Sequence, residues 1–73
     1  MNITVKIHIK EVRNSKGISI RQLAEKTNLS KSYLSEVENG HYMPSIFVLC
    51  KIAIALDVKP EKLFSYEIEN NCP

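Results

Sequence analysis

Residues 30 to 40, SKSYLSEVENG, combine a predicted helix with a polar face of short side chains. Ser30 is a typical N-cap residue, and Gly40 is a typical stop for such a helix. At about 100° per residue, Leu34 and Val37 point inward. The opposite face carries one cation, one anion, two hydroxyls and one amide, from Lys31, Ser32, Ser35, Glu36 and Asn39. This face is either an ordinary solvated surface or a binding surface on which a polar partner approaches the backbone closely.

Residue types that support catalysis or metal binding are present without the spacing that such chemistry needs. Neither His8 nor His41 has a Ser or Cys at motif spacing for nucleophilic catalysis. The chain contains no Cys-x-x-Cys or His-x-x-x-His pair for a metal, and no glycine-rich phosphate loop. Cys50 lies in an apolar stretch and is expected in the core, whereas Cys72 is expected to be exposed near the end. The sequence therefore predicts no enzyme, no metal site and no cofactor.

The distribution of charge is more informative than the net charge of +2. Residues 1–30 hold six Lys and Arg against two Glu, a net +4, whereas residues 31–59 balance and residues 60–73 sum to −2. A basic first half predicts an anionic partner. The length of 73 residues predicts one domain. The apolar runs are too short to span a bilayer and no signal peptide is evident, so a cytoplasmic protein is expected.

Five helices are predicted from apolar periodicity and capping residues, over 9–16, 19–27, 30–39, 45–56 and 60–64. Ser19 and Gln22 have the spacing of a capping box at the start of the second helix. The fourth helix is apolar nearly all round and is expected to be central. The predicted inward side chains are Ile9, Val12, Ile20, Leu23, Ala24, Leu34, Val37, Ile46, Leu49, Ile52, Ala53 and Leu56. Phe47 and Ile54 form a second apolar side, which is expected either to lie under the chain's own tail or to contact a second copy.

Both ends of the chain show the alternation that is typical of strands. Residues 3–9 alternate apolar β-branched with polar side chains, and residues 64–69 alternate in a similar way. One polar side is basic and the other is acidic, so residues 3–7 and 65–69 are predicted to pair within one chain or between two. The alternative is that residues 1–8 and 65–73 are unpaired terminal extensions.

The helices 19–27 and 30–39, joined by a short turn, are predicted to form a helix-turn-helix whose second helix suits the DNA major groove. From Ile9 to Phe64 the sequence resembles the Cro/cI-type (XRE, lambda-repressor-like) family of helix-turn-helix DNA-binding domains. The matching pieces are IKEVRNSKGIS, RQLAEKTNLSKSYLSEVENG, the Pro44-Ser45 pair and LCKIAIALDV with PEKLF. The resemblance implies an all-α, compact five-helix domain over residues 9–64, to which the terminal strands would add a small two-stranded sheet.

The resemblance also implies which side chains contact DNA. Bases would be contacted by Lys31, Ser32, Ser35 and Glu36, where Lys31 can donate to guanine and Glu36 can accept from cytosine. Phosphates would be contacted by Arg13, Ser19, Arg21, Gln22, Ser30, Tyr33, Asn39, His41 and Tyr42. Arg13 and Glu38 match a pair that forms a salt bridge between the first and third helices of the family.

Two positions depart from the family pattern. Directly after the second helix's cap, where the family often has a Gln that contacts the DNA backbone, this chain has Ile20. The fifth helix has Lys59 where Ser, Thr or Asp usually provides a cap. The first departure is expected to affect affinity for DNA more than the fold.

The predicted function is a bacterial or phage-type transcriptional regulator, a repressor that reads double-stranded DNA through the major groove with helix 30–39. Because one such domain contacts few base pairs, a homodimer on a roughly palindromic operator is expected. Its candidate dimer surfaces are Phe47 with Ile54, the Leu63–Phe64 region and the terminal strands. The alternative is an antitoxin or protein-interaction module, with a toxin or antirepressor as partner. The expected location is the cytoplasm, in association with the nucleoid.

Overall fold

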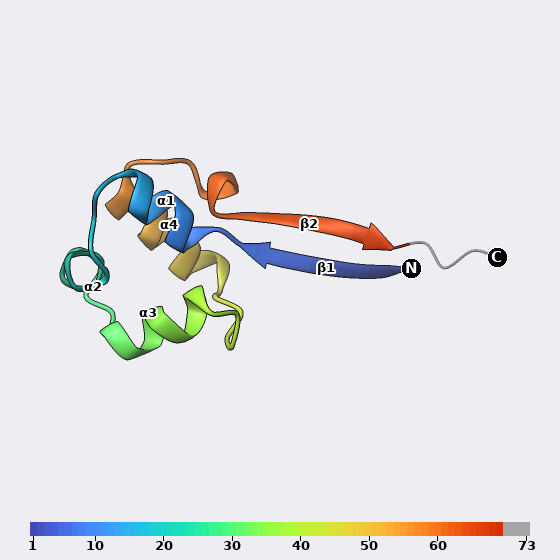
Figure 1. Ribbon diagram of the computed structural model, residues 1–73, viewed down its shortest axis with the longest axis horizontal. Helices are drawn as coiled ribbons and strands as arrows, with labels where there is room; N and C mark the ends of the chain where they lie inside the picture. The colour runs from blue at the N-terminus through green and yellow to red at the C-terminus, as the bar shows by residue number, and fades with distance from the viewer. Residues whose placement is uncertain (70–73) are drawn as a thin grey trace.

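The computed structural model describes residues 1–69, which form four α-helices, one 3-10 turn and two strands. The order along the chain is β1 (Asn2–Ile7), α1 (Ile9–Ser15), α2 (Ile20–Thr27), α3 (Lys31–Glu38), α4 (Ile46–Leu56), η1 (Pro60–Leu63) and β2 (Phe64–Glu69). The helices gather into one body, from which the two strands project together as a ribbon (Figure 1). The expected exposure of Cys72 concerns a residue outside the described range.

The helix boundaries follow from the capping residues that the sequence presents. The Ser19, Ser30 and Ser45 hydroxyls each accept a hydrogen bond from the backbone N–H three residues further on, at the starts of α2, α3 and α4. Gly17 and Gly40, after α1 and α3, have φ of 69° and 80°, in the left-handed region that glycine adopts without strain. These stops keep α1 and α3 short, which leaves the end of each helix close to the protein surface.

The expected fifth α-helix is a 3-10 turn of four residues, Pro60–Leu63. Lys59 stands at its N-cap position and makes no side-chain cap, so the first turn lacks the hydrogen bond that a Ser, Thr or Asp would supply. The chain then extends directly into β2 at Phe64. The five-helix prediction is therefore wrong by one element, because too few residues separate Pro60 from the strand for an α-helix to propagate.

The core lies between the four helices and η1, and its hydrophobic cluster is made of side chains from the predicted inward faces together with Leu63. Its fully or nearly fully buried members are Ile9, Leu23, Leu34, Val37, Leu49, Ile52, Ala53, Leu56 and Leu63. Ile46 was expected among them but is 71% exposed. It is the first residue of α4, so its side chain extends beyond the end of the core instead of over it.

The second apolar side of α4 stays open in the described part of the chain. Phe47 is 75% exposed and Ile54 is 81% exposed. Residues up to Glu69 do not cover them, because β2 runs away from the helical body alongside β1 (Figure 1). The expectation that the tail buries these two side chains is therefore wrong for residues 64–69.

The predicted pairing of the two ends is confirmed as an antiparallel two-stranded sheet within one chain. The register places Ile3 opposite Ile68, Val5 opposite Tyr66 and Ile7 opposite Phe64. Since side chains alternate between faces, these six residues share one apolar face. Ile7 and Phe64 pack against the core and anchor this face to the helical body.

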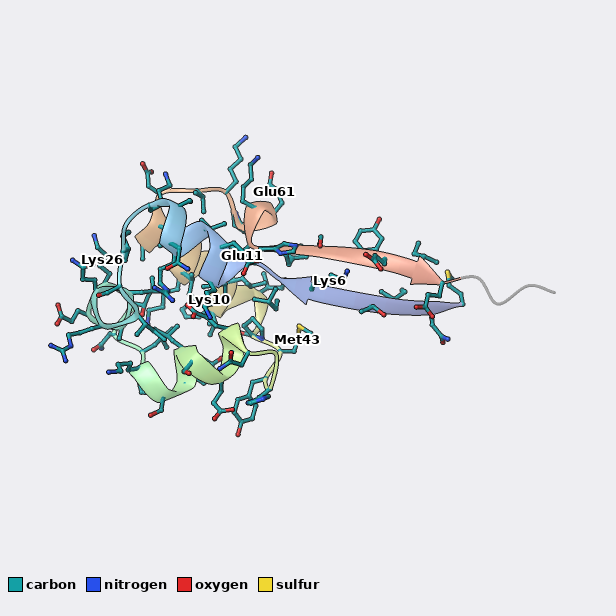
Figure 2. The ribbon with its side chains drawn as sticks, in the orientation of Figure 1. Lys6, Lys10, Glu11, Lys26, Met43 and Glu61 are labelled. Atoms are coloured by element: carbon teal, nitrogen blue, oxygen red, sulfur yellow. The ribbon has the colours of Figure 1, made fainter. Side chains whose placement is uncertain are left out.

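The other face of the ribbon carries its charges. Lys6 donates from Nζ to Oε1 of Glu67 at 2.8 Å, diagonally across the two strands. In the side-chain view, Lys6 lies between the two strands (Figure 2). This contact is the cross-strand attraction of opposite charges that the sequence predicts, and it lowers the pKa of the Glu67 carboxyl by hydrogen bonding first and Coulomb attraction second.

Candidate nucleic-acid interface

The helix-turn-helix is built from α2 and α3, which pack against each other across a short turn. Asn28 ends α2 in the left-handed conformation, with φ of 59°. The buried Thr27 hydroxyl donates to the Leu23 carbonyl at 2.7 Å, which closes the last turn of α2 from inside. Two residues after Asn28, the Ser30 cap starts α3. These local bonds hold the two helices at a fixed angle, and α3 lies along one outer edge of the body (Figure 1).

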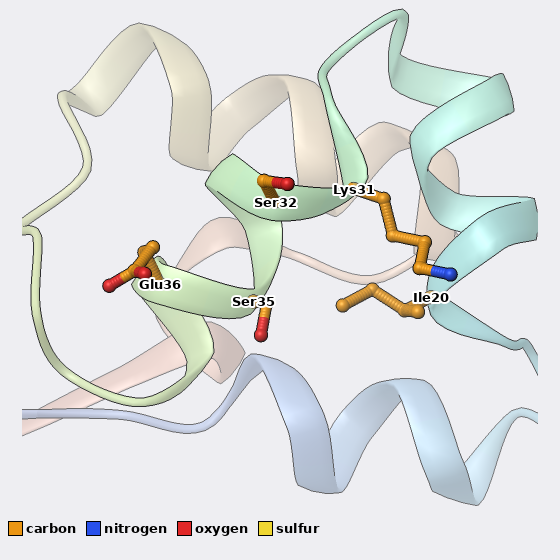
Figure 3. Close-up of a pocket in the computed structure, with 5 residues that line it drawn as sticks. All are labelled: Ile20, Lys31, Ser32, Ser35 and Glu36. Atoms are coloured by element: carbon orange, nitrogen blue, oxygen red, sulfur yellow. The ribbon is translucent and has the colours of Figure 1, made fainter.

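The outward side of α3 forms an open depression of about 320 Å³. Its lining contains all four side chains that the sequence assigned to base contacts, Lys31, Ser32, Ser35 and Glu36, with Ile20 of α2 as the fifth. In the close-up, Lys31 and Ile20 lie at one end, Glu36 lies at the other, and the two serines lie between them (Figure 3). Leu34 and Val37 are fully buried on the opposite side of the same helix, as the helical periodicity predicts.

The depression offers hydrogen-bond donors and acceptors in a defined order along α3. Lys31 supplies three N–H donors, the two serine hydroxyls can donate or accept, and the Glu36 carboxylate accepts only. All four side chains are short or lie at the edge, so the helix backbone can come close to a partner. This arrangement suits the base edges of the major groove, where donors and acceptors differ between base pairs.

His41 lies beside this depression and contacts Glu36 instead of standing free. Its Nδ1 approaches Oε2 of Glu36, which leaves Oε1 of that carboxylate as the oxygen open to a partner. The backbone N–H of His41 also donates to the Glu36 carbonyl at 2.9 Å. The phosphate contact that the resemblance implies for His41 stays a prediction, and the structure adds a contact with Glu36.

Arg13 and Glu38 form the ion pair between α1 and α3 that the resemblance implies. Nε donates to Oε2 at 2.8 Å, and Nη2 donates to Oε1 at 3.1 Å. Nη1 donates to the Ile18 carbonyl at 3.0 Å. The hydrogen bond to Glu38 raises the pKa of Arg13 and outweighs the opposing effect of burial, with Coulomb attraction adding to the rise.

The Arg13–Glu38 pair is largely buried, and the phosphate contact that the resemblance also implies for Arg13 stays a prediction. The side chains of Arg13 and Glu38 are only 11% and 5% exposed. All three guanidinium nitrogens already donate within the protein. Arg13 therefore ties α1 to α3 and to the loop before α2.

The residues assigned to phosphates at the helix starts are exposed and lie at capping positions. Ser19 and Gln22 complete a reciprocal capping box, with distances of 2.8 Å and 3.1 Å. The Ser30 hydroxyl accepts from the Tyr33 N–H at 3.0 Å. In each case the serine hydroxyl uses an oxygen lone pair and keeps its hydrogen for another acceptor. Arg21 is exposed next to the first of these caps.

The remaining assigned residues surround the end of α3. The rings of Tyr33 and Tyr42 stack with centroids 6.4 Å apart, so the loop after α3 folds back over its own helix. Tyr42 is exposed, whereas Tyr33 is half-buried. Asn39 is exposed and its amide lies 3.5 Å from the Ser35 hydroxyl. Met43, on the same loop, projects outward (Figure 2).

Ile20 is the member of the depression that the sequence did not place there. Apolar periodicity assigned it to the core, and the structure shows it half-buried, packed against the core on one side and lining the depression on the other. The signal that could have indicated this dual position was its place directly after the Ser19 cap, where a helix has only just entered the core. At this position the chain lacks the Gln that often contacts the DNA backbone in the family. It presents the apolar side chain of Ile20 to the depression instead.

The described residues also bear on metal ligands, on membrane-spanning helices and on Cys50. Across residues 1–69, no group of three or more His, Cys, Asp or Glu side chains could hold a metal ion. In the same range, no helix has the length and apolar character that crossing a membrane requires. Cys50 was expected to be buried in the core, but it is only half-buried.

Known proteins are similar to this chain in sequence and in fold. The HTH-type transcriptional regulator SlrR of Bacillus subtilis is 45% identical over 60 residues, which cover 81% of this chain and 40% of SlrR. The immunity repressor protein of Bacillus phage phi105 is 38% identical over 65 residues, which cover 89% of this chain and 45% of the repressor. The chain thus spans less than half the length of these curated relatives.

Solved structures give the same result. A crystal structure from Bacteroides fragilis, described as that of a candidate DNA-binding protein, superposes with a TM-score of 0.80 at 31% identity, covering 85% of this chain and all of that one. The biofilm regulator SinR in complex with DNA superposes with a TM-score of 0.69 at 44% identity, covering 74% of this chain and 87% of that one. A complex of SinR with SinI superposes with a TM-score of 0.70 at 43% identity, covering 75% of this chain and 54% of that one.

The family comparison covers most of the described chain. A family model described as helix-turn-helix matches residues 9–63, which contain all four α-helices and the 3-10 turn. The matched segment includes the α2–turn–α3 unit and the depression on α3. The chain therefore belongs to the Cro/cI-type (XRE) helix-turn-helix family.

Proposed function

We propose that this protein is a sequence-specific, double-stranded DNA-binding regulator of transcription, which represses by occupying an operator. The observation that carries the proposal is the depression on α3, where Lys31, Ser32, Ser35 and Glu36 meet on the outward face of a helix-turn-helix. The relatives named as regulators and as a phage repressor support the same function. Such a protein would work in the bacterial cytoplasm, on the nucleoid.

In the proposed complex, α3 lies in the major groove with its polar face toward the bases. Lys31 donates to guanine, and the open oxygen of Glu36 accepts from the cytosine amino group. The serines make shorter contacts and allow the helix to sit deep in the groove. Glu36 repels phosphates, so its value lies in rejecting operators that offer no donor at its position.

Contacts to the DNA backbone would hold α3 in register. The hydroxyl hydrogens of Ser19 and Ser30, the exposed Arg21 and the free amide N–H groups of Gln22 can donate to phosphate oxygens. Asn39 and Tyr42 can do so at the other end of α3. Such contacts position the domain without specifying sequence, and they make binding weaker as salt rises.

We also propose that a second copy binds alongside, so that two α3 helices read two halves of a roughly palindromic operator. Of the expected dimer surfaces, the Leu63–Phe64 region is unsuitable, because Leu63 is fully buried and Phe64 packs against the core. The exposed apolar side of α4, formed by Ile46, Phe47 and Ile54, is better placed. It belongs to the rigid helical body, so contact there fixes the distance between the two α3 helices.

The dimer is tested by sedimentation equilibrium of the wild type and two matched variants. Ile54→Ser removes an apolar side chain from α4, and Ile68→Ser removes the same side chain from the ribbon. We expect the first to weaken self-association by about tenfold or more and the second to leave it unchanged. The reverse order would place the dimer on the ribbon, and a wild type that stays monomeric at high concentration and on operator DNA would contradict the dimer.

A protein partner is the second candidate function, and the SinR–SinI complex favours it, since a relative of this chain forms a protein complex. The partner could be a toxin or an antirepressor. The polar depression on α3 lacks the large apolar anchors of protein–protein contacts, so a partner would bind the exposed apolar side of α4 instead. A partner that competes with Ile54-dependent self-association and leaves binding to a half-operator intact would support this function.

DNA reading is tested by selection from random duplex DNA at two salt concentrations, followed by sequencing. Lys31→Ala removes a cation from the depression, and Lys62→Ala removes one from the exposed 3-10 turn as a matched control. We expect a two-fold symmetric site that Lys31→Ala alters at a defined base pair and Lys62→Ala does not. Unselective binding that depends only on salt, equal in both variants, would contradict the proposal.

A further inference from the structure

Ile20 is the apolar member of a depression whose other lining residues are polar. It reaches the depression from the first turn of α2, whereas the other four residues come from α3 (Figure 3). Its side chain lies at the same end as Lys31 (Figure 3). An apolar group in this place adds nothing to phosphate binding, because it can neither donate a hydrogen bond nor carry charge.

The orientation of Ile20 is held by the protein before any ligand arrives. One side of the side chain packs against the core cluster, and Ser19 and Gln22 lock the backbone next to it through the capping box. Isoleucine is also branched at Cβ, which limits rotation about χ1. A contact made by such a preordered side chain loses little conformational entropy.

The chemistry of the major groove leaves one counterpart for this side chain. Base edges there present hydrogen-bond donors and acceptors, and the only apolar group is the C5 methyl of thymine. Resting on the proposed function, in which this depression faces the bases, we infer that Ile20 reads a thymine methyl next to the base pair contacted by Lys31. The protein would then prefer thymine at one defined position of each half-site.

The inference is tested by removing only the methyl group from the DNA. Each thymine of the selected operator is replaced in turn by uracil, and the dissociation constant is measured by fluorescence anisotropy. Burial of one methyl contributes about a fourfold change in affinity. We expect wild-type binding to weaken about fourfold per half-site at one thymine and to stay unchanged at the others.

Two variants assign the effect to Ile20. Ile20→Ala should bind the thymine and uracil operators equally well, since the methyl has lost its partner. Ile18→Ala is the matched control, because Ile18 also packs at the edge of the core but does not line the depression. Thermal unfolding of both variants checks that each remains folded at the assay temperature, and Ile18→Ala should keep the wild-type preference for thymine.

The outcomes separate this inference from the function on which it rests. A selected operator whose uracil substitutions have no effect, or have equal effects in the wild type and Ile20→Ala, overturns the role of Ile20 and leaves sequence reading by α3 intact. If Ile20→Ala binds both operators more weakly than the wild type does, and by the same factor, Ile20 contacts the deoxyribose instead of the methyl group. This result also overturns the role of Ile20. Unselective binding in the random-DNA selection overturns both.

Discussion

Replacing Arg13 with methionine is predicted to destabilise the fold severely, although it adds an apolar side chain of similar length. The substitution removes both hydrogen bonds to Glu38, at 2.8 Å and 3.1 Å, and the bond to the Ile18 carbonyl. Glu38 is only 5% exposed on its side chain, so its carboxylate would remain buried without a partner.

The size of the loss follows from this burial. Removing one member of a buried ion pair destabilises a protein by about 3–5 kcal/mol. A domain of this length has a total stability of about 4–11 kcal/mol, and each kcal/mol shifts the melting temperature by about 4–8 °C. We therefore expect Arg13→Met to lose about 3 kcal/mol and to melt about 15 °C below the wild type.

Urea denaturation followed by circular dichroism measures this loss, and two controls give it meaning. Lys6→Met breaks an ion pair of the same 2.8 Å length whose side chains are 51% and 61% exposed, so its effect should be too small to resolve. The double variant Arg13→Met/Glu38→Leu removes both charges and should regain most of the lost stability. A single-variant loss below about 1 kcal/mol, or a double variant no better than the single, would refute the reasoning.

Three further changes have defined outcomes. Lys6 lowers the pKa of Glu67, so this pKa should rise toward the ordinary glutamate value in Lys6→Met, as measured by NMR titration. Because the pKa of Glu67 is lower in the folded state than in the unfolded state, the small stabilisation by the pair is complete above the ordinary pKa. It is lost as pH falls through the folded-state pKa. Ser30→Ala removes the acceptor for the Tyr33 N–H and should lose about 1 kcal/mol in urea denaturation, with a change near zero contradicting the cap. Gly40→Ala should lower the free energy of unfolding by about 1 kcal/mol, because alanine is strained at φ +80°. The new Cβ meets no atom within 4 Å, so the loss reports backbone strain alone. Full wild-type stability would contradict this strain.

The predicted elements that proved right are those whose signals are local. Serine caps, glycine stops and 3.6-residue periodicity each depend on neighbours a few residues away, and they place α1 to α4 within one or two residues of the structure. The terminal strands were predictable for a further reason, since both carry strict alternation and their polar sides carry opposite charges. The Lys6–Glu67 contact is the direct result of that pattern.

The predictions that failed needed knowledge of where an element ends in space. Ile46 has the periodicity of a core residue, yet it stands at the first position of α4, beyond the core. Of the two places expected for Phe47 and Ile54, under the tail or against a second copy, the first is not occupied by residues 64–69, because β2 continues along β1 and leaves them open. The 3-10 turn replaces a fifth helix because β2 starts immediately after it at Phe64, within the predicted helix 60–64.

Within the site, the sequence indicated which side chains share the outward face of α3 but not what lies beside them. The contact of His41 with Glu36 depends on the path of the loop after Gly40. The presence of Ile20 in the depression depends on how α2 and α3 cross. Both are tertiary features, and both bear on which bases the depression can accept.

The most direct test of the central claim, that α3 reads bases, is the base-preference profile of Glu36→Gln compared with the wild type. The substitution keeps the size and shape of the side chain and exchanges a carboxylate for an amide, which pairs well with adenine. The account predicts that preference at one base pair of each half-site shifts from cytosine toward adenine, while every other position is unchanged. An identical profile in both proteins would show that Glu36 does not face the bases and would contradict the proposed reading of DNA by α3.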